Sequence, residues 1–127
     1  VESTQATAGT WAPAPSTIQG YGGQALASMS SLGYGQTWQD VSASRALATT
    51  YYNTTGKPIE VANTVSIGPN GTSTFSINGL QVDVGQLGIG SGITCFPNRS
   101  YIIPPGASYI QTAINASVSI SFWVELR

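Results

Sequence analysis

The sequence predicts an all-β fold, an antiparallel β-sandwich preceded by a short irregular or partly helical segment. Two stretches alternate between apolar and polar residues, Ile59–Ile67 and Ala116–Leu126. A period of two is typical of strands with one buried face. Asn70-Gly71, Asn78-Gly79 and Pro104-Pro105-Gly106 favour reversals of chain direction between such strands.

The composition indicates one domain with a short extension. We place the extension at residues 1–34 and the sandwich at 35–127, because residues 1–34 are rich in Gly, Ala, Ser, Thr and Gln and lack a convincing strand. Charged residues make up 7% of the chain and the net charge is −1. We therefore expect no nucleic-acid partner. No apolar run approaches the ~18 residues of a membrane span, so no membrane insertion is expected.

Residues 45–84 are predicted to form an antiparallel meander. Residues 45–52 and 59–67 are expected to pair as a hairpin around the turn at 53–56. The apolar face of the second strand includes one polar residue, Asn63, which either fixes register at a symmetric interface or sits at a bulge or reaches a loop backbone.

A second predicted hairpin joins Thr72–Ile77 to Leu80–Val84 through Asn78-Gly79. Its return strand is expected to point Leu80, Val82 and Val84 inward. Residues 85–99 are predicted to be irregular because of their glycines, with brief pairing at 93–96, and their Gly-x-Gly-x-Gly lacks the context of a phosphate-binding loop.

The last third is predicted to be β again, with strands at 101–103, 108–114 and 116–126. In the last strand we expect one face to be apolar and to cover the core. Its members are Ala116, Val118, Ile120, Phe122, Val124 and Leu126. Trp123 falls on the opposite, polar face, where burial against a neighbouring subunit or loop would explain it.

The residues that commonly perform catalysis are scarce. Histidine is absent and Cys95 is the single cysteine, which removes zinc sites, thiol–imidazole pairs and intrachain disulfides. The five carboxylates share no motif, so we expect no enzyme, no metal and no cofactor. Only a carboxylate pair across a subunit interface would permit hydrolysis. These acids are Glu2, Asp40, Glu60, Asp83 and Glu125.

Two further features have local interpretations. Asp40 and Arg45 flank a short turn, and an ion pair between them would fix how the chain enters the first strand. Four Asn-x-Ser/Thr triplets are attributed to chance in a chain rich in Asn, Ser and Thr. They begin at Asn53, Asn70, Asn98 and Asn115.

Three segments, in order, resemble the C-terminal tip domains of tail fibres from tailed bacteriophages and prophages. They are GQTWQDV with SRALATTYYNTTGKPIEV (35–61), SYIIPPGASYIQ (100–111) and SISFWVELR (119–127). The resemblance implies a jelly-roll-like sandwich, a homotrimer, and a virion protein that is extracellular when it acts. It also implies that residues 1–34 end a fibre shaft, ordered mainly by trimerisation and continuing into the rest of the tail fibre at the N-terminus. We expect the chain to be a piece of a longer protein that ends naturally at Arg127.

The function implied by this resemblance is binding of a host receptor without catalysis. The receptor would be a surface glycan such as lipopolysaccharide, or an outer-membrane protein. Candidate receptor-binding residues, taken from the predicted loops, are Asn70, Phe96, Asn98 and Arg99, although residues of these types in loops are more often ordinary turn residues. A carbohydrate-binding module of a secreted protein and a purely structural fibre component are the alternatives.

Overall fold

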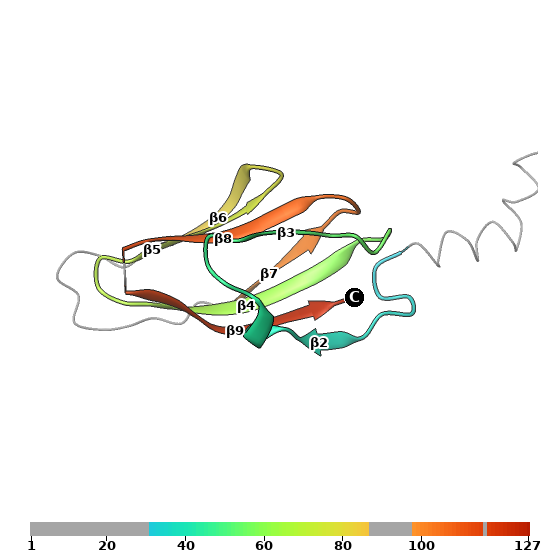
Figure 1. Ribbon diagram of the computed structural model, residues 1–127, viewed down its shortest axis with the longest axis horizontal. Helices are drawn as coiled ribbons and strands as arrows, with labels where there is room; N and C mark the ends of the chain where they lie inside the picture. Colours follow the sequence, from blue (N-terminus) through green and yellow to red (C-terminus); the bar gives the residue numbers. More distant parts are fainter. Residues whose placement is uncertain (1–30, 87–97, 116) are drawn as a thin grey trace, which may run out of the picture. The chain divides into compact units, whose positions relative to one another are not determined.

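The computed structural model describes residues 31–86, 98–115 and 117–127. The chain divides into two compact units, Val1–Gly35 and Gln36–Arg127. All the described strands lie in the second unit (Figure 1). The predicted shaft segment lies outside the described residues except for 31–34, as do Cys95, Phe96 and the pairing expected at 93–96.

The described strands form two antiparallel four-stranded sheets, which confirms the predicted all-β sandwich. One sheet has the order β2-β9-β4-β7 and the other β3-β8-β5-β6. Successive strands alternate between the sheets, apart from the β5–β6 hairpin, and this double-sheet arrangement of eight strands is a jelly roll. The strands are β2 (Trp38–Asp40), β3 (Thr50–Tyr52), β4 (Ile59–Ile67), β5 (Thr72–Ile77), β6 (Leu80–Gln86), β7 (Asn98–Ile103), β8 (Ser108–Ile114) and β9 (Val118–Leu126).

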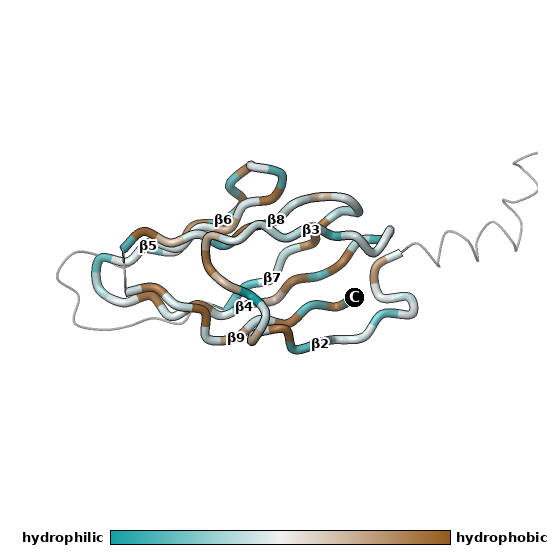
Figure 2. The backbone as a smooth tube through the Cα atoms, in the orientation of Figure 1, coloured by the Kyte–Doolittle hydropathy of each residue, from teal (hydrophilic) through white to brown (hydrophobic). Residues whose placement is uncertain are grey.

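The core lies between the sheets and is built around aromatic rings. Phe75 stacks on Tyr101 with ring centroids 3.9 Å apart, and Trp123 lies 6.1 Å from Phe75 and 6.5 Å from Tyr109. β4 contributes its alternate, fully buried residues to the same space, as its sequence pattern predicts. Figure 2 shows this alternation of hydrophobic and hydrophilic residues along the strands. Each large ring buries ~150–250 Å², so these few residues dominate the apolar burial.

The predicted hairpin between residues 45–52 and 59–67 is wrong. β3 pairs with β8 in one sheet, and β4 pairs with β7 and β9 in the other. The turn at 53–56 therefore carries the chain across from one sheet to the other. Because β4 and β5 also belong to different sheets, the predicted meander reduces to the β5–β6 hairpin, which is present.

Two β-bulges reverse the predicted direction of side chains. In β9, Thr64 pairs with Phe122 and Val65 with Ile120, so Ser121 is an extra residue without a partner. Val118 lies in the core on one side of this bulge, whereas beyond it Trp123 and Glu125 face inward. The expectation of one continuous apolar inner face is therefore wrong for the second half of β9, because an extra residue exchanges the two faces.

The bulge in β6 has the same effect. Phe75 pairs with Asp83 and Ser76 with Gln81, which leaves Val82 extra. Leu80, Val82 and Val84 are all exposed, against the prediction that they face inward. The irregular stretch expected at 85–99 is also too long at both ends, since β6 continues to Gln86 and β7 begins at Asn98.

Candidate functional site

A buried carboxylate, Glu125 of β9, accepts hydrogen bonds from four side chains. Arg45 donates from Nε to Oε2 at 2.8 Å and from Nη2 to Oε1 at 2.9 Å. Tyr109 Oη and Trp123 Nε1 donate to Oε2 at 3.0 and 3.1 Å, and Arg127 Nη1 donates to Oε1 at 2.5 Å. Glu125 is fully buried, and both of its carboxylate oxygens accept hydrogen bonds from side chains of the same chain. We call Arg45, Tyr109, Trp123, Glu125 and Arg127 the Glu125 cluster.

The electrostatics of the Glu125 cluster keep the carboxylate ionised. Burial by itself raises the pKa of Glu125, but the hydrogen bonds and charge of Arg45, together with Tyr109 and Arg127, outweigh burial and lower that pKa. Burial and the Glu125 charge raise the pKa of Tyr109 to about 12, so its hydroxyl remains a donor. The Arg45 guanidinium also lies over the Tyr51 ring, 4.5 Å from its centroid.

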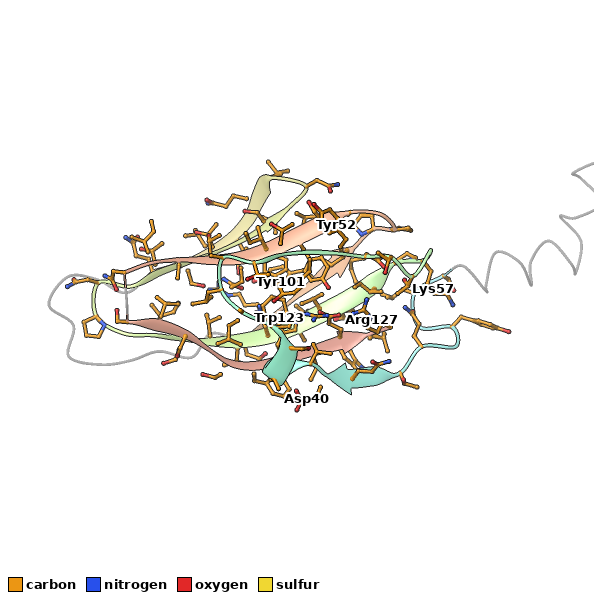
Figure 3. All side chains as sticks on the ribbon, in the orientation of Figure 1. Asp40, Tyr52, Lys57, Tyr101, Trp123 and Arg127 are labelled. Atoms are coloured by element: carbon orange, nitrogen blue, oxygen red, sulfur yellow. The ribbon has the colours of Figure 1, made fainter. Side chains whose placement is uncertain are left out.

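All three segments that carry the resemblance meet in the Glu125 cluster. Arg45 comes from the first segment, Tyr109 from the second, and Trp123, Glu125 and Arg127 from the third. The predicted Asp40–Arg45 pair is wrong, because Asp40 instead accepts hydrogen bonds from Ser42 N and Oγ at 3.0 and 2.7 Å. Figure 3 shows Asp40 pointing away from the sandwich, whereas Trp123 lies between the sheets.

A second buried polar residue, Asn53, holds one end of the sandwich together. Its Nδ2 donates to the carbonyl oxygens of Lys57, Ile103 and Pro104 at 2.7, 3.0 and 3.1 Å. Its Oδ1 accepts from Thr55 N and Oγ1. The side chain thus joins the turn after β3 to the turn after β7, and its full burial in the folded chain leaves it inaccessible to a glycan.

Asn63 makes neither of the contacts expected for it. Its Nδ2 donates to Gln111 Oε1 at 2.9 Å, and Gln111 Nε2 donates to Ser73 Oγ at 2.6 Å. All three side chains are buried, so the chain of hydrogen bonds connects the two sheets through the core. Asn63 therefore pairs with a side chain of the facing sheet rather than with a loop backbone.

The structure does not gather the candidate receptor-binding residues into one site. Asn70 is exposed in the turn between β4 and β5, and its carbonyl accepts a hydrogen bond from Asn115 Nδ2. Asn98 and Arg99 begin β7 rather than lying in a loop, and as neighbours in a strand they point to opposite faces. Phe96 lies outside the described residues.

The Arg99 side chain is engaged within the sandwich. Its Nη1 donates to Asp83 Oδ2 at 2.5 Å, and Tyr101 Oη donates to the same oxygen at 2.6 Å. Although burial raises the pKa of Asp83, the hydrogen bonds from Tyr101 and Arg99 outweigh it and lower that pKa. β6 and β7 are edge strands of different sheets, so this contact fastens the two sheets along one side.

Turns at the end that carries Asn70 form a small hydrogen-bonded platform. Gly68 N donates to Ser117 O at 2.7 Å, and Ser117 Oγ donates to Pro69 O at 2.9 Å. The β4–β5 and β8–β9 connections are thereby tied to each other. Asn70 is exposed on this tied end, which presents it without the cost of ordering a free loop. The exposed Asn115 is itself part of the tie, since its Oδ1 accepts hydrogen bonds from Ser117 N and Oγ at 3.1 and 2.7 Å.

The described part of the chain contains no group of three or more His, Cys, Asp or Glu residues placed to hold a metal ion. It also has no helix long and apolar enough to cross a membrane.

Comparisons with protein-family models, with curated proteins and with solved structures found no match to this chain.

Proposed function

We propose that this chain is the receptor-binding tip of a tail fibre from a tailed bacteriophage or prophage. It would bind a bacterial surface glycan such as lipopolysaccharide, or an outer-membrane protein, during adsorption and without catalysis. The observation that supports this proposal is the convergence of the three resembling segments on the Glu125 cluster. That segments far apart in sequence build one buried network supports the proposal, because the resemblance then falls on residues that hold the sandwich together.

The position of the three resembling segments also distinguishes the structural framework of the sandwich from the surface that we propose for receptor recognition. The resembling segments supply all of the Glu125 cluster, whereas the turn at 68–71 and the stretch around Phe96 and Asn98 lie outside them. Function in β-sandwiches is commonly carried by the connections at one end of a rigid scaffold. We therefore place recognition at the end that carries Asn70 and Asn115, with neutral amide and aromatic side chains as the contacting groups.

The test is binding of the fluorescently labelled 127-residue chain to a panel of Gram-negative strains. Saturable binding to some strains, lost on mutants with truncated lipopolysaccharide or on protease-treated cells, is expected and identifies the receptor class. Asn70→Gly, which keeps the positive φ of this turn residue, and Asn98→Ala should weaken that binding. Thr54→Ala is the matched control, because Thr54 is exposed and precedes β4, whereas Asn70 follows it at the other end of the strand.

Two outcomes would reject the proposal. Absence of binding to every strain, with a folded trimer in solution, would favour a structural role in the fibre. A monomer that binds soluble oligosaccharides but no cells would favour a carbohydrate-binding module.

A further inference from the structure

The ion pair between Arg99 and Asp83 is the most exposed of the ion pairs among the described residues. The side chains of Arg99 and Asp83 are 35% and 24% exposed, whereas Glu125, the carboxylate of the other pairs, is fully buried. The pair joins β7 to β6, which are edge strands of different sheets. We call Asp83, Arg99 and Tyr101 the Arg99 site.

The groups of the Arg99 site are held in place by the sandwich itself. Asp83 Oδ2 accepts hydrogen bonds from Arg99 Nη1 at 2.5 Å and from Tyr101 Oη at 2.6 Å. The Tyr101 ring stacks on the buried Phe75, with centroids 3.9 Å apart, so its hydroxyl is a rigidly placed donor. The guanidinium lies against the backbone of β6, since a Cβ on Gly85 would be 3.4 Å from Nη1 and 3.7 Å from Nη2. Groups fixed in this way lose little conformational freedom when they bind a ligand.

Arg99 retains hydrogen-bond donors that the described part of the chain does not use. A guanidinium carries several N–H donors in one plane. Nη1 of Arg99 donates to Asp83, whereas Nε and Nη2 have no acceptor among the described residues. Because the side chain is partly exposed, these donors can be reached from the solvent.

The two opposite charges of the Arg99 site favour a neutral ligand that both donates and accepts hydrogen bonds. Asp83 would repel an anion that approached Arg99, and Arg99 would repel a cation that approached Asp83. A sugar ring with two adjacent hydroxyl groups suits both residues, because one hydroxyl accepts from the guanidinium while its neighbour donates to the carboxylate. Hydrogen bonds to ionised groups are about twice as strong as those between neutral groups, so this pairing gives a small neutral ligand its strongest contacts.

We infer that the Arg99 site binds a neutral sugar through two adjacent hydroxyl groups. This inference rests on the proposed function, because it takes the receptor to be a surface glycan rather than an outer-membrane protein. Arg99 and Asp83 contact the sugar. Tyr101 is a positioning residue, since its hydroxyl orients the carboxylate of Asp83.

The test is titration of the isotopically labelled 127-residue chain with the methyl α-glycosides of mannose, galactose and glucose, followed by NMR. These probes present adjacent hydroxyls in cis and in trans. At least one should give a saturable shift of the Arg99 Nε–H signal and of the amide signals of β6 and β7. Asp83→Asn and Arg99→Lys should weaken that binding about tenfold or more, because each removes a charge-assisted contact. Tyr101→Phe keeps the ring but loses the hydroxyl, so it should weaken binding by a smaller factor. Thr54→Ala is the matched control and should bind as the wild type does.

The absence of a saturable shift with all three glycosides would overturn the inference, as would unchanged binding in Asp83→Asn or a shift caused by inorganic phosphate but by no glycoside. If circular dichroism shows that Asp83→Asn does not fold, Arg99→Lys and Tyr101→Phe decide. The cell-binding assay separates this inference from the proposed function. Binding of a glycoside without binding to any strain would reject the proposed function and leave the inference standing, whereas binding to strains that is unchanged in Arg99→Lys would do the reverse.

Discussion

Arg45 and Glu125 are 80 residues apart in sequence and form a two-pronged ion pair inside the sandwich, with N–O distances of 2.8 and 2.9 Å. Arg45 lies in the connection from β2 to β3, and Glu125 lies near the end of β9. The pair therefore ties the connection between the two sheets to the last strand. When one partner of a fully buried carboxylate is removed, the folded state is strongly destabilised.

Glu125→Gln should destabilise the protein strongly. It keeps the volume of the side chain but leaves the guanidinium groups of Arg45 and Arg127 around a neutral amide. Breaking a buried ion pair by removing one partner costs about 3–5 kcal/mol, and urea denaturation at pH 7 measures this loss. Asp40→Asn is the control, since Asp40 is exposed and its carboxylate accepts hydrogen bonds only from the nearby Ser42. Equal stability of the two variants would contradict the role assigned to the Glu125 cluster.

Stability should fall in acid because of the same carboxylate. The pKa of Glu125 is lowered in the folded state, so the unfolded chain takes up its proton first as the pH falls. The stabilisation is thus fully present above the unfolded pKa of about 4.3 and is lost as pH falls through the lower folded pKa. The free energy of unfolding of wild type and Glu125→Gln, measured from pH 7 to 2, should converge at the acid end. A difference that stays constant would show that Glu125 does not titrate as stated.

Asn53→Ala should loosen the end of the sandwich opposite Asn70. The substitution removes the donor to three carbonyl oxygens, those of Lys57, Ile103 and Pro104. A buried acceptor left without a donor costs about 1–3 kcal/mol, so we expect a loss of at least about 2 kcal/mol in urea. Thr54→Ala, at the exposed neighbouring position, should change stability by less than about 0.5 kcal/mol. Similar values for both variants would rule out this role for Asn53.

The fold class and most of the strands could be predicted from the sequence, because alternation and turn residues are local signals. The strands predicted at 72–77 and 108–114 match β5 and β8 in their bounds. Which strands pair with each other was harder to predict from the sequence. The turn residues after Tyr52 are compatible with a hairpin and with a crossing between the two sheets. The crossing is stabilised by the hydrogen bond from Asn53 to the backbone 50 residues away, at the end of β7, which local sequence does not reveal.

Side-chain direction and the Glu125 cluster could not be predicted, because both depend on the bulges. Nothing in the residues around Ser121 or Val82 marks an extra residue, so simple alternation places Glu125 on the polar face and Val84 in the core. The nearest acid in sequence to Arg45 is Asp40, whereas its true partner is brought to it only by the jelly-roll topology. The outward direction of Phe122 follows from the bulge in β9 and could not be predicted for the same reason.

The hydrogen bond between Asn63 and Gln111 should appear as strong coupling in a double-mutant cycle. Asn63→Val leaves the buried Gln111 Oε1 without its donor, and Gln111→Leu leaves Asn63 Nδ2 without its acceptor, so each should cost about 1–3 kcal/mol. The double variant removes both polar groups together. Its loss of unfolding free energy in urea should therefore be smaller than the sum of the two single losses, by about 0.5–3 kcal/mol. Losses that add to within about 0.3 kcal/mol would mean that the two side chains do not interact across the core, and that the sheets are joined there by apolar packing alone.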